Sequence, residues 1–219
     1  MKNVVLIGAS GFVGSAILNE ALNRGHQVTA VVLNPQKVEV ANPNLTIVQA
    51  DATDVETLAA IAKGKDAIIS AYNPGWGNPR QYEETLENYP KIVEGAKRSG
   101  VKRLLIVGGA GTLFVQPGVR LVDTGTLPAE WLPGVKSLGE FYLNTLINEH
   151  AIDWVFFSPA ANLGNMGTGV RTGKYRLGKD DMLFDEKGES FISVEDYAVA
   201  MIDELERENH HFERFTAAY

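Results

Sequence analysis

The sequence predicts an α/β fold built on a doubly wound, largely parallel sheet of about seven strands. Two observations predict it. Apolar, β-rich runs alternate with amphipathic helical runs along the whole chain. The first run, residues 4–7, holds four apolar side chains, three of them β-branched, which is typical of a strand buried on both faces. Glycines follow it directly, and residues 12–24 then carry apolar side chains at helical spacing.

The first half of the chain continues this alternation. Asp54 is a typical N-cap for a helix that ends near Lys63. A longer helix is expected from Tyr82 to the residue before Gly100, with a kink at Pro90. The strands expected in this half are residues 27–33, 45–50, 66–70 and 102–107.

The second half predicts two more helices. One covers residues 135–149. The other begins at Ser193, which forms a capping box with Asp196, and runs through Leu205. A glycine-rich stretch lies between them, so its strands are expected to be short. The strands expected in this half are residues 152–157, 173–177, 182–184 and 212–216.

Three glycines with the spacing G-x-x-G-x-x-G connect the first strand to the first helix. Gly8 lets the chain turn off the strand, Gly11 lets the backbone approach a pyrophosphate, and Gly14 lets the helix pack close to the sheet. The N–H groups of the first helical turn then face the phosphates, and Ser10 adds a hydroxyl. This strand, turn and helix in order predict a dinucleotide site.

The end of the second strand normally selects between NAD and NADP. A carboxylate there binds the ribose hydroxyls and repels a 2′-phosphate, whereas a cation favours the phosphate. This chain has Leu33 and Asn34 at that point, with Lys37 as the nearest cation. The missing carboxylate and the available lysine favour NADP slightly, and NAD remains the alternative.

Other strand ends carry candidate ligand-binding residues, because ligands bind outside the carboxyl ends of the strands in open α/β sheets. Asp51 follows the third strand, where it either accepts a hydrogen bond from an adenine amino group or caps its own turn. The loop over residues 71–79 contains two prolines, two glycines and two aromatic residues, which predicts a semi-rigid wall beside the cofactor. A second glycine cluster, residues 108–111, follows the fifth strand.

Composition narrows the classes of partner. The chain has 219 residues, 45% of them hydrophobic, so we expect one domain over residues 1–219 with a small substrate-side insertion at 160–192. It has no cysteine, which excludes disulfides and thiolate chemistry. The net charge is −7 without a basic cluster, the histidines lack metal-ligand spacing, and no apolar run is long enough for a signal peptide or membrane span. We therefore expect a cytoplasmic protein with a small-molecule substrate, without nucleic acid, membrane or metal.

Over essentially its whole length the chain resembles the short-chain dehydrogenase/reductase superfamily. Within it, the chain is most similar to the atypical group of NADH–flavin reductases, NmrA-like proteins and biliverdin reductase B-type flavin reductases. The residues that carry the resemblance are Gly8-Ala9-Ser10-Gly11-Phe12-Val13-Gly14, Asp51-Ala52, Gly108-Gly109-Ala110, Lys136 with Glu140, Ser158-Pro159-Ala160, and Ile192 to Ala198.

The resemblance implies a continuous cofactor groove along the strand ends. In such proteins, the residues that match Ala9 to Val13 hold the pyrophosphate, and those that match Asp51-Ala52 flank the adenine. Residues that match Ser70-Ala71-Tyr72 contact the ribose, and those that match Ser158-Pro159-Ala160 line the nicotinamide. Lys136 would orient the ribose, and Thr112, which aligns only approximately with the active-site Ser/Thr, would orient the acceptor.

The chain departs from the family at one catalytic position. Catalytic members use a tyrosine four residues before a lysine, which lowers the pKa of the phenol for proton exchange. Leu132 occupies that position before Lys136, and the spacing of Tyr142 is typical of a buried packing residue. The ordinary alcohol dehydrogenase or epimerase mechanism is therefore in doubt.

The favoured hypothesis is an NAD(P)H-dependent reductase for a flavin, quinone or similar planar acceptor, which needs mainly stacking over the nicotinamide. Trp76, Tyr72 and Phe114 would supply planar contacts, or they simply pack on the domain. Two alternatives stay open: an NmrA-like dinucleotide sensor without turnover, and a relative of the epimerases and dehydratases. The protein is expected to be a monomer or a homodimer, since the helix from Tyr82 to Arg98 resembles one that pairs in family dimers.

Overall fold

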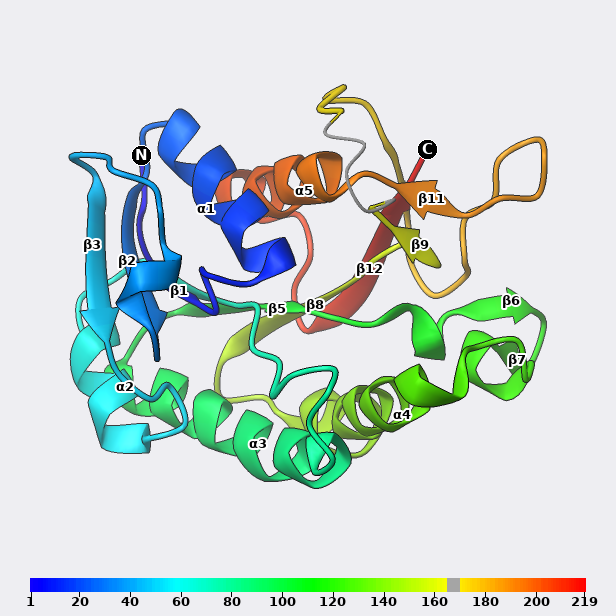
Figure 1. The fold of residues 1–219 in the computed structure, drawn as a ribbon, viewed down its shortest axis with the longest axis horizontal. Helices are drawn as coiled ribbons and strands as arrows, with labels where there is room; N and C mark the ends of the chain where they lie inside the picture. Colours follow the sequence, from blue (N-terminus) through cyan, green and yellow to red (C-terminus); the bar gives the residue numbers. More distant parts are fainter. Residues whose placement is uncertain (165–169) are drawn as a thin grey trace.

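The computed structural model describes residues 1–164 and 170–219 and has one main sheet between two layers of helices (Figure 1). In the described residues this sheet has eight strands in the order β10-β12-β8-β5-β4-β1-β2-β3. The strands of the main sheet are β1 (Asn3–Ile7), β2 (Gln27–Val32), β3 (Leu45–Gln49), β4 (Ala67–Ser70), β5 (Arg103–Val107), β8 (Asp153–Ser158), β10 (Arg176–Gly178) and β12 (Glu213–Ala218).

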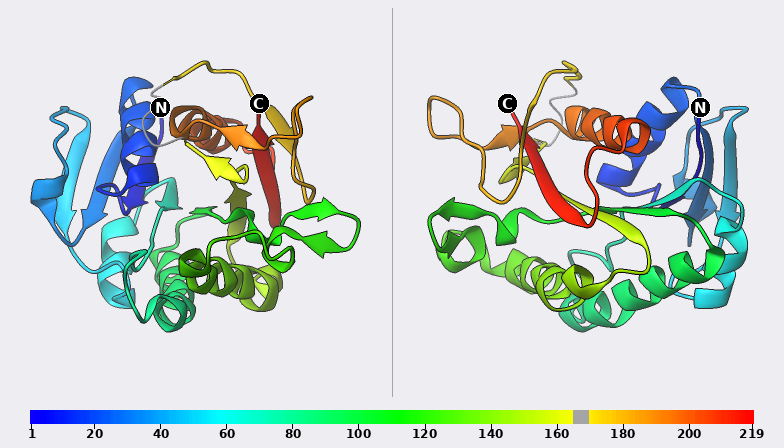
Figure 2. Two further views of the ribbon diagram at one scale, coloured as in Figure 1. Left: turned by 45° about the vertical axis from the view of Figure 1, so that its right-hand side comes forward. Right: turned by 180° about the vertical axis from the view of Figure 1, so that it is seen from behind.

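The helices cover both faces of this sheet. Figures 1 and 2 show α1 and α5 on one face and α2, α3 and α4 on the other. The two layers are a consequence of right-handed crossovers between parallel strands. The helices are α1 (Phe12–Asn23), α2 (Val55–Ala62), α3 (Gln81–Ser99), α4 (Leu132–Glu140) and α5 (Val194–Arg207).

Strand β1 lies at the centre of the sheet and explains the apolar run at the start of the chain. It pairs in parallel with β2 on one side and β4 on the other, so the strand order reverses beside it. Val4 and Leu6 pack into the core under α1 and α5, while Val5 and Ile7 pack into the core under α2 and α3. A strand that is buried on both faces needs apolar residues at every position.

The predicted fold class is confirmed, with one strand more than expected. The eighth strand, β10, overlaps the short strand expected at residues 173–177 but begins only at Arg176, and it pairs antiparallel with β12 at the edge of the sheet. Small two-stranded units, β6 (Phe114–Gln116) with β7 (Val119–Arg120) and β9 (Asn162–Leu163) with β11 (Phe191–Ile192), lie outside the main sheet.

Three local predictions need correction. The helix expected at residues 135–149 begins earlier, at Leu132, and changes after Glu140 to a π-helical turn over Phe141–Thr145. Residues 182–184 form no strand; instead the backbone of Phe114 bonds to Asp180 and Met182 on either side of a single bridge. In the capping box, Ser193 accepts the hydrogen bond from the Asp196 N–H, as predicted.

The second half of that capping box is absent because the Asp196 carboxylate binds elsewhere. It accepts hydrogen bonds from the backbone and hydroxyl of Thr172, the backbone of Gly173 and the hydroxyl of Tyr219. Asp196 therefore fixes the segment around Thr172 to the start of α5. Part of the insertion predicted at 160–192, residues 165–169, lies outside the described residues, and its role as a separate unit stays a prediction.

A search of the described helices for a membrane-crossing segment gave none, because none is both long enough and apolar enough.

Candidate functional site

The turn between β1 and α1 is shaped by two glycines that the chain itself requires. Gly8 has a φ of +78°, and a Cβ on it would lie 2.5 Å from the carbonyl oxygen of Ala71. A Cβ on Gly14 would lie 2.0 Å from the carbonyl oxygen of Gly8. Both glycines therefore let β1, the β4 end and α1 come together, as the sequence predicts.

Gly11 differs from these two glycines because the protein does not require it. Its φ of −85° and ψ of 171° are open to any residue. A Cβ there would meet only the Gly8 carbonyl oxygen at 3.4 Å, an ordinary contact. Gly11 is also exposed, so the space beside it is free. Folding therefore does not require a glycine at position 11. A glycine there fits a pyrophosphate that approaches the exposed backbone from outside.

The start of α1 has the electrostatics of an anion site. The N–H groups of Phe12, Val13 and Gly14 have no acceptor within the helix, and no side chain caps them. The first turn also carries no acidic residue. The side chains of Asp54 and Ser193 cap α2 and α5, whereas α3 and α4 also begin without a side-chain cap. Because the helix dipole favours negative charge at an uncapped N-terminus, the described residues fit the phosphates of a dinucleotide.

The β4 end forms the next part of the predicted groove. The backbone N–H of Ala71 bonds to the carbonyl of Ile7, which holds the β4 end against β1. Tyr72 is fixed in the α3 layer, where its hydroxyl accepts a hydrogen bond from Asn88 at 2.7 Å and its carbonyl accepts one from Tyr89 at 2.9 Å. The Tyr72 ring is therefore held in place by the protein and is not free to move onto a ligand. Ser70 is fully buried.

Ser158 marks the end of β8, where the resemblance places the nicotinamide. Its side chain is fully buried, and its hydroxyl has no hydrogen-bond partner among the described residues. A buried hydroxyl without a partner costs free energy unless a ligand or water satisfies it. Pro159 and Ala160 continue from it and are also buried. The hydroxyl is enclosed by the protein, so its contact with a nicotinamide remains a prediction.

The β2 end, where NADP and NAD would be distinguished, presents an apolar side chain and no carboxylate. Leu33 is 71% exposed directly after β2. The side chain of Asn34 caps a short helix, Pro35–Lys37, by accepting the N–H of Gln36. Lys37 closes this short helix and is exposed.

The adenine end of the predicted groove includes Asp51 and Ala52. One oxygen of Asp51 accepts hydrogen bonds from both the backbone and the hydroxyl of Thr53, at 2.8 and 2.7 Å. This is the turn-capping arrangement that the sequence left open as an alternative. Asp51 is exposed, and Ala52 is buried.

The second glycine cluster is explained by packing within the protein. A Cβ on Gly108 would lie 2.6 Å from the ring of Phe156, and one on Gly111 would lie 2.2 Å from Val135 in α4. The backbone of Gly109 is extended, and a Cβ on it would lie 3.4 Å from Leu138. These glycines therefore allow α4 and the core to pack closely against the end of β5. Binding of the cofactor by Gly108 and Gly109 remains a prediction.

Thr112 is less accessible than a residue that orients an acceptor should be. It is 4% exposed, and its hydroxyl accepts a hydrogen bond of 2.7 Å from the guanidinium of Arg214. Arg214 is equally buried, lies over the ring of Tyr142 and also donates to Asp180. Sequence reasoning missed Arg214, because nothing local to the last strand links it to Thr112.

Lys136 lies on the exposed side of α4 and makes no ion pair with any described side chain. Leu132 stands one turn before it, where a catalytic tyrosine would be needed. Glu140, one turn after it, accepts a hydrogen bond from Tyr82 of α3.

The protein holds all of its tyrosines in the neutral form. Burial is the main cause of the raised pKa of six phenols, and in Tyr82 the hydrogen bond to Glu140 raises the pKa. A catalytic tyrosine would need the opposite shift. The tyrosines with a raised pKa are Tyr72, Tyr82, Tyr89, Tyr142, Tyr175, Tyr197 and Tyr219. None of the described tyrosines therefore has the lowered pKa that a Tyr–Lys pair produces.

The aromatic residues predicted to contact an acceptor do not form one group. Trp76 pairs with Trp131, a residue that the sequence did not single out, with ring centroids 6.4 Å apart. Phe114 instead lies beneath the guanidinium of Arg120, 5.6 Å from ring centroid to guanidinium carbon.

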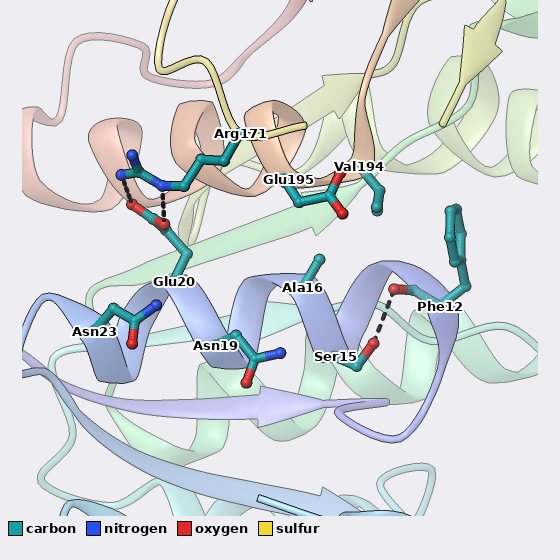
Figure 3. Close-up of a pocket in the computed structure, with 9 residues that line it drawn as sticks. All are labelled: Phe12, Ser15, Ala16, Asn19, Glu20, Asn23, Arg171, Val194 and Glu195. Atoms are coloured by element: carbon teal, nitrogen blue, oxygen red, sulfur yellow. Dashed lines mark hydrogen bonds and ion pairs between the residues drawn. The ribbon is translucent and has the colours of Figure 1, made fainter. Parts of the chain in front are cut away.

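A hollow of about 300 Å³ lies between α1 and the start of α5 (Figure 3). Arg171 reaches across it to Glu20, with two hydrogen bonds of 2.8 Å. Among the described residues that line it, Phe12 alone also belongs to the predicted cofactor set. The hollow is lined by Phe12, Ser15, Ala16, Asn19, Glu20, Asn23, Arg171, Val194 and Glu195.

The parallel sheet and the glycine turn at its strand ends define a dinucleotide-binding α/β protein of the Rossmann type. Residues 8–208 match the profile of the family described as NAD(P)H-binding, and the chain belongs to that family. The predicted kinship with the atypical short-chain dehydrogenase/reductase group is confirmed at this level, and a nicotinamide dinucleotide is the cofactor class.

Three similar proteins cover nearly the whole chain. The uncharacterised protein YwnB of Bacillus subtilis is 42% identical over 213 residues, which are 96% of this chain and 95% of YwnB. The structure of a candidate epimerase from Bacteroides thetaiotaomicron is 58% identical, with a TM-score of 0.93 and coverage of 100% and 97%. That of a candidate NADH-flavin reductase from Streptococcus pneumoniae is 32% identical, with a TM-score of 0.83 and coverage of 100% and 99%.

Proposed function

We propose that the protein is an NAD(P)H-dependent reductase of a flavin, quinone or similar planar acceptor. The observation that carries the proposal is the combination of a bare cofactor cradle at Gly11 with Leu132 in place of a proton-donating tyrosine. The similarity to a candidate NADH-flavin reductase also supports it.

The proposed reaction needs little from the protein besides positioning. A bound reduced nicotinamide supplies a hydride, which carries two electrons to the acceptor ring, while one proton from water completes the hydroquinone or reduced flavin. The chain would bind the pyrophosphate at residues 9–13, orient the ribose with Lys136 and hold the nicotinamide against Ser158. The protein would contribute by holding the nicotinamide and the acceptor ring in the orientation that hydride transfer needs.

We further propose NADP as the preferred cofactor, because Leu33 and Lys37 offer no negative charge to repel a 2′-phosphate. A small-molecule acceptor, a cytoplasmic location and a monomer or homodimer complete the proposal. Neither nucleic acid nor a membrane surface is expected to bind a chain of net charge −7 without a basic cluster.

The test is oxidation of NADPH and of NADH in the presence of FMN, riboflavin and a small quinone. Wild-type protein is compared with Gly11→Asp, whose carboxylate would repel and block the pyrophosphate. Ala60→Asp is the control, because it adds the same charge at an exposed position of α2. Turnover that Gly11→Asp abolishes and Ala60→Asp retains is the expected result, with the unfolding temperature of both variants close to wild type.

Two other functions predict different outcomes of this assay. The similarity to a candidate epimerase favours isomerisation or dehydration of a substrate on bound NAD, which would give no net oxidation of added NADPH. A dinucleotide sensor would bind NADPH tightly and reduce no acceptor. Tight binding without turnover of any acceptor would therefore overturn the reductase proposal.

A further inference from the structure

The exposed tryptophans Trp76 and Trp131 lie in two different segments, the loop after β4 and a short helix before α4, and their rings lie close together. Their exposed fractions are 58% and 47%, and their ring planes are tilted by 55°. We infer that Trp131, with Trp76 behind it, is the platform on which the conjugated ring of the acceptor stacks. This inference rests on the proposed reductase function and assigns Trp131 as an acceptor-binding residue of that site.

The loop that carries Trp76 is held rigid by its own hydrogen bonds. Asn73 accepts the N–H of Gly75 at 2.7 Å, and Gly75 needs to be glycine because its φ is +111°. Asn78 donates to Glu84 of α3 at 2.8 Å and accepts the N–H of Arg80 at 2.9 Å. A loop with this many internal bonds keeps its indole in place without paying ordering entropy when a ligand binds.

The segment that carries Trp131 is packed directly against that loop. Trp131 ends a short helix, Ala129–Trp131, and α4 continues from it at once. The side chain of Gln81 is 2% exposed and lies so close to Gly134 in α4 that a Cβ there would be 2.5 Å from its amide nitrogen. The same Gln81 side chain donates to Asn73. Gln81 therefore ties the two tryptophan-bearing segments into one unit.

This unit stands over the strand ends where the nicotinamide half of the groove is predicted. The Trp76 loop leaves the end of β4, and α4 packs on the glycine cluster that follows β5. Strands β4 and β5 are neighbours in the sheet, and β8, with Ser158 at its end, follows β5. An acceptor that takes hydride at this edge of the sheet can therefore extend over α4 toward Trp131.

The chemistry of the pair favours an oxidised, electron-poor ring. The face of an indole carries partial negative charge, so it attracts electron-poor aromatic systems in offset stacking. Oxidised flavins and quinones are electron-poor, and their reduced products are not. The ring centroids are 6.4 Å apart, less than the separation of about 7 Å needed to insert a ring between two stacked partners. The acceptor therefore stacks on the free face of Trp131 rather than between the two indoles.

The test separates binding of the acceptor from turnover. Trp131→Ala, Trp131→Phe and the control Phe212→Ala are compared by calorimetric titration of FMN and of a small quinone into protein saturated with NADP⁺. Phe212 is 44% exposed and directly precedes β12, so it lies at the amino end of the parallel strands and not at their carboxyl ends. We expect Trp131→Ala to weaken acceptor binding and raise its KM about five- to tenfold, with the Kd for NADPH unchanged. Trp131→Phe restores most of the affinity, because it keeps a planar face.

Two results would overturn the assignment of Trp131. Unchanged acceptor binding and KM in Trp131→Ala, with turnover intact, would refute the platform and leave the reductase function standing. A change in oligomeric state, measured by sedimentation and without effect on acceptor binding, would make the tryptophan pair a contact between two copies of the chain. Failure of the reductase function itself is distinct, because wild-type protein would then reduce no acceptor.

Discussion

Gly14 faces the carbonyl of Gly8 so closely that a Cβ on Gly14 would lie 2.0 Å from that oxygen, whereas a Cβ on Gly11 would approach the same oxygen only to 3.4 Å. The two glycines of the turn therefore have different roles. Gly14 is required for α1 to pack on β1, and Gly11 is free to serve a ligand.

This difference predicts opposite behaviour of two alanine variants. Gly14→Ala should lower the free energy of unfolding by about 3 kcal/mol, because the backbone has to move to avoid the clash. Gly11→Ala should leave the free energy of unfolding within about 0.5 kcal/mol of wild type but weaken NADPH binding about tenfold or more. Urea unfolding and fluorescence titration of NADPH measure the two effects. Similar loss of stability in both variants would contradict the assignment.

The cofactor preference is tested at the end of β2. Leu33→Asp places a carboxylate where the ribose hydroxyls of NAD are normally bound, so it should weaken NADPH binding about tenfold or more and leave NADH binding equal or tighter. Leu33→Asn is the matched control, because it changes shape without adding charge. Titration of NADPH and of NADH into wild-type protein and the two variants gives the ratio of the two dissociation constants for each protein. Wild-type protein that binds NADH more tightly than NADPH would refute the proposed NADP preference.

The hydrogen bonds that Arg214 donates to Thr112 and Asp180 are expected to contribute to the stability of the folded protein. Arg214→Met should lower the free energy of unfolding by about 2 kcal/mol, because Thr112 loses a charged hydrogen bond and Asp180 loses its partner. Asp180 is half exposed, so Asp180→Asn should cost less. Urea unfolding of the two variants gives the comparison, and an unchanged midpoint in Arg214→Met would show that the network contributes no stability.

Asp196 predicts a loss of stability in acid. Burial would raise the pKa of this carboxyl, but hydrogen bonds from Thr172, Tyr219 and Gly173 outweigh burial and hold its pKa below the usual value. A depressed pKa stabilises the folded state above the unfolded pKa of about 4, and that stability is lost as the pH falls through the folded pKa.

The measurement is the free energy of unfolding from neutral pH down to about pH 3, for wild type and Asp196→Asn. The variant should be less stable at neutral pH, and its stability should fall less steeply below about pH 4. Equal slopes for the two proteins would show that Asp196 does not contribute to the acid sensitivity.

The sequence predicts the parts of the structure that depend on local pattern. The apolar run at 4–7, the turn at Gly8 and the caps Asp54 and Ser193 each follow from residues that are neighbours in the chain. The short strands are missed for the opposite reason. The strand expected at 182–184 fails because its backbone partner is Phe114, which lies in a hairpin too short to show a period of two.

The site beyond the cofactor turn could not be predicted, because it depends on contacts between distant segments. Arg214 bonds to Thr112 across a separation of 102 residues, and no pattern around either residue indicates the partner. Trp131 lies beside Trp76 across a separation in the chain, in segments that are also joined by the close packing of Gln81 against Gly134. The family resemblance predicted which residues contact the cofactor, but it implied no role for this tryptophan pair.

The most direct test of the central claim is to locate bound NADP⁺ by the backbone and side-chain amide signals of ¹⁵N-labelled protein. We predict that the largest shifts fall on the backbone amides of Gly11 to Gly14, with the side-chain amides of Asn19 and Asn23 in the hollow between α1 and α5 unaffected. If those amides stay unchanged while the side-chain amides of Asn19 and Asn23 in that hollow move, the cofactor binds there instead, and the strand-end site is wrong.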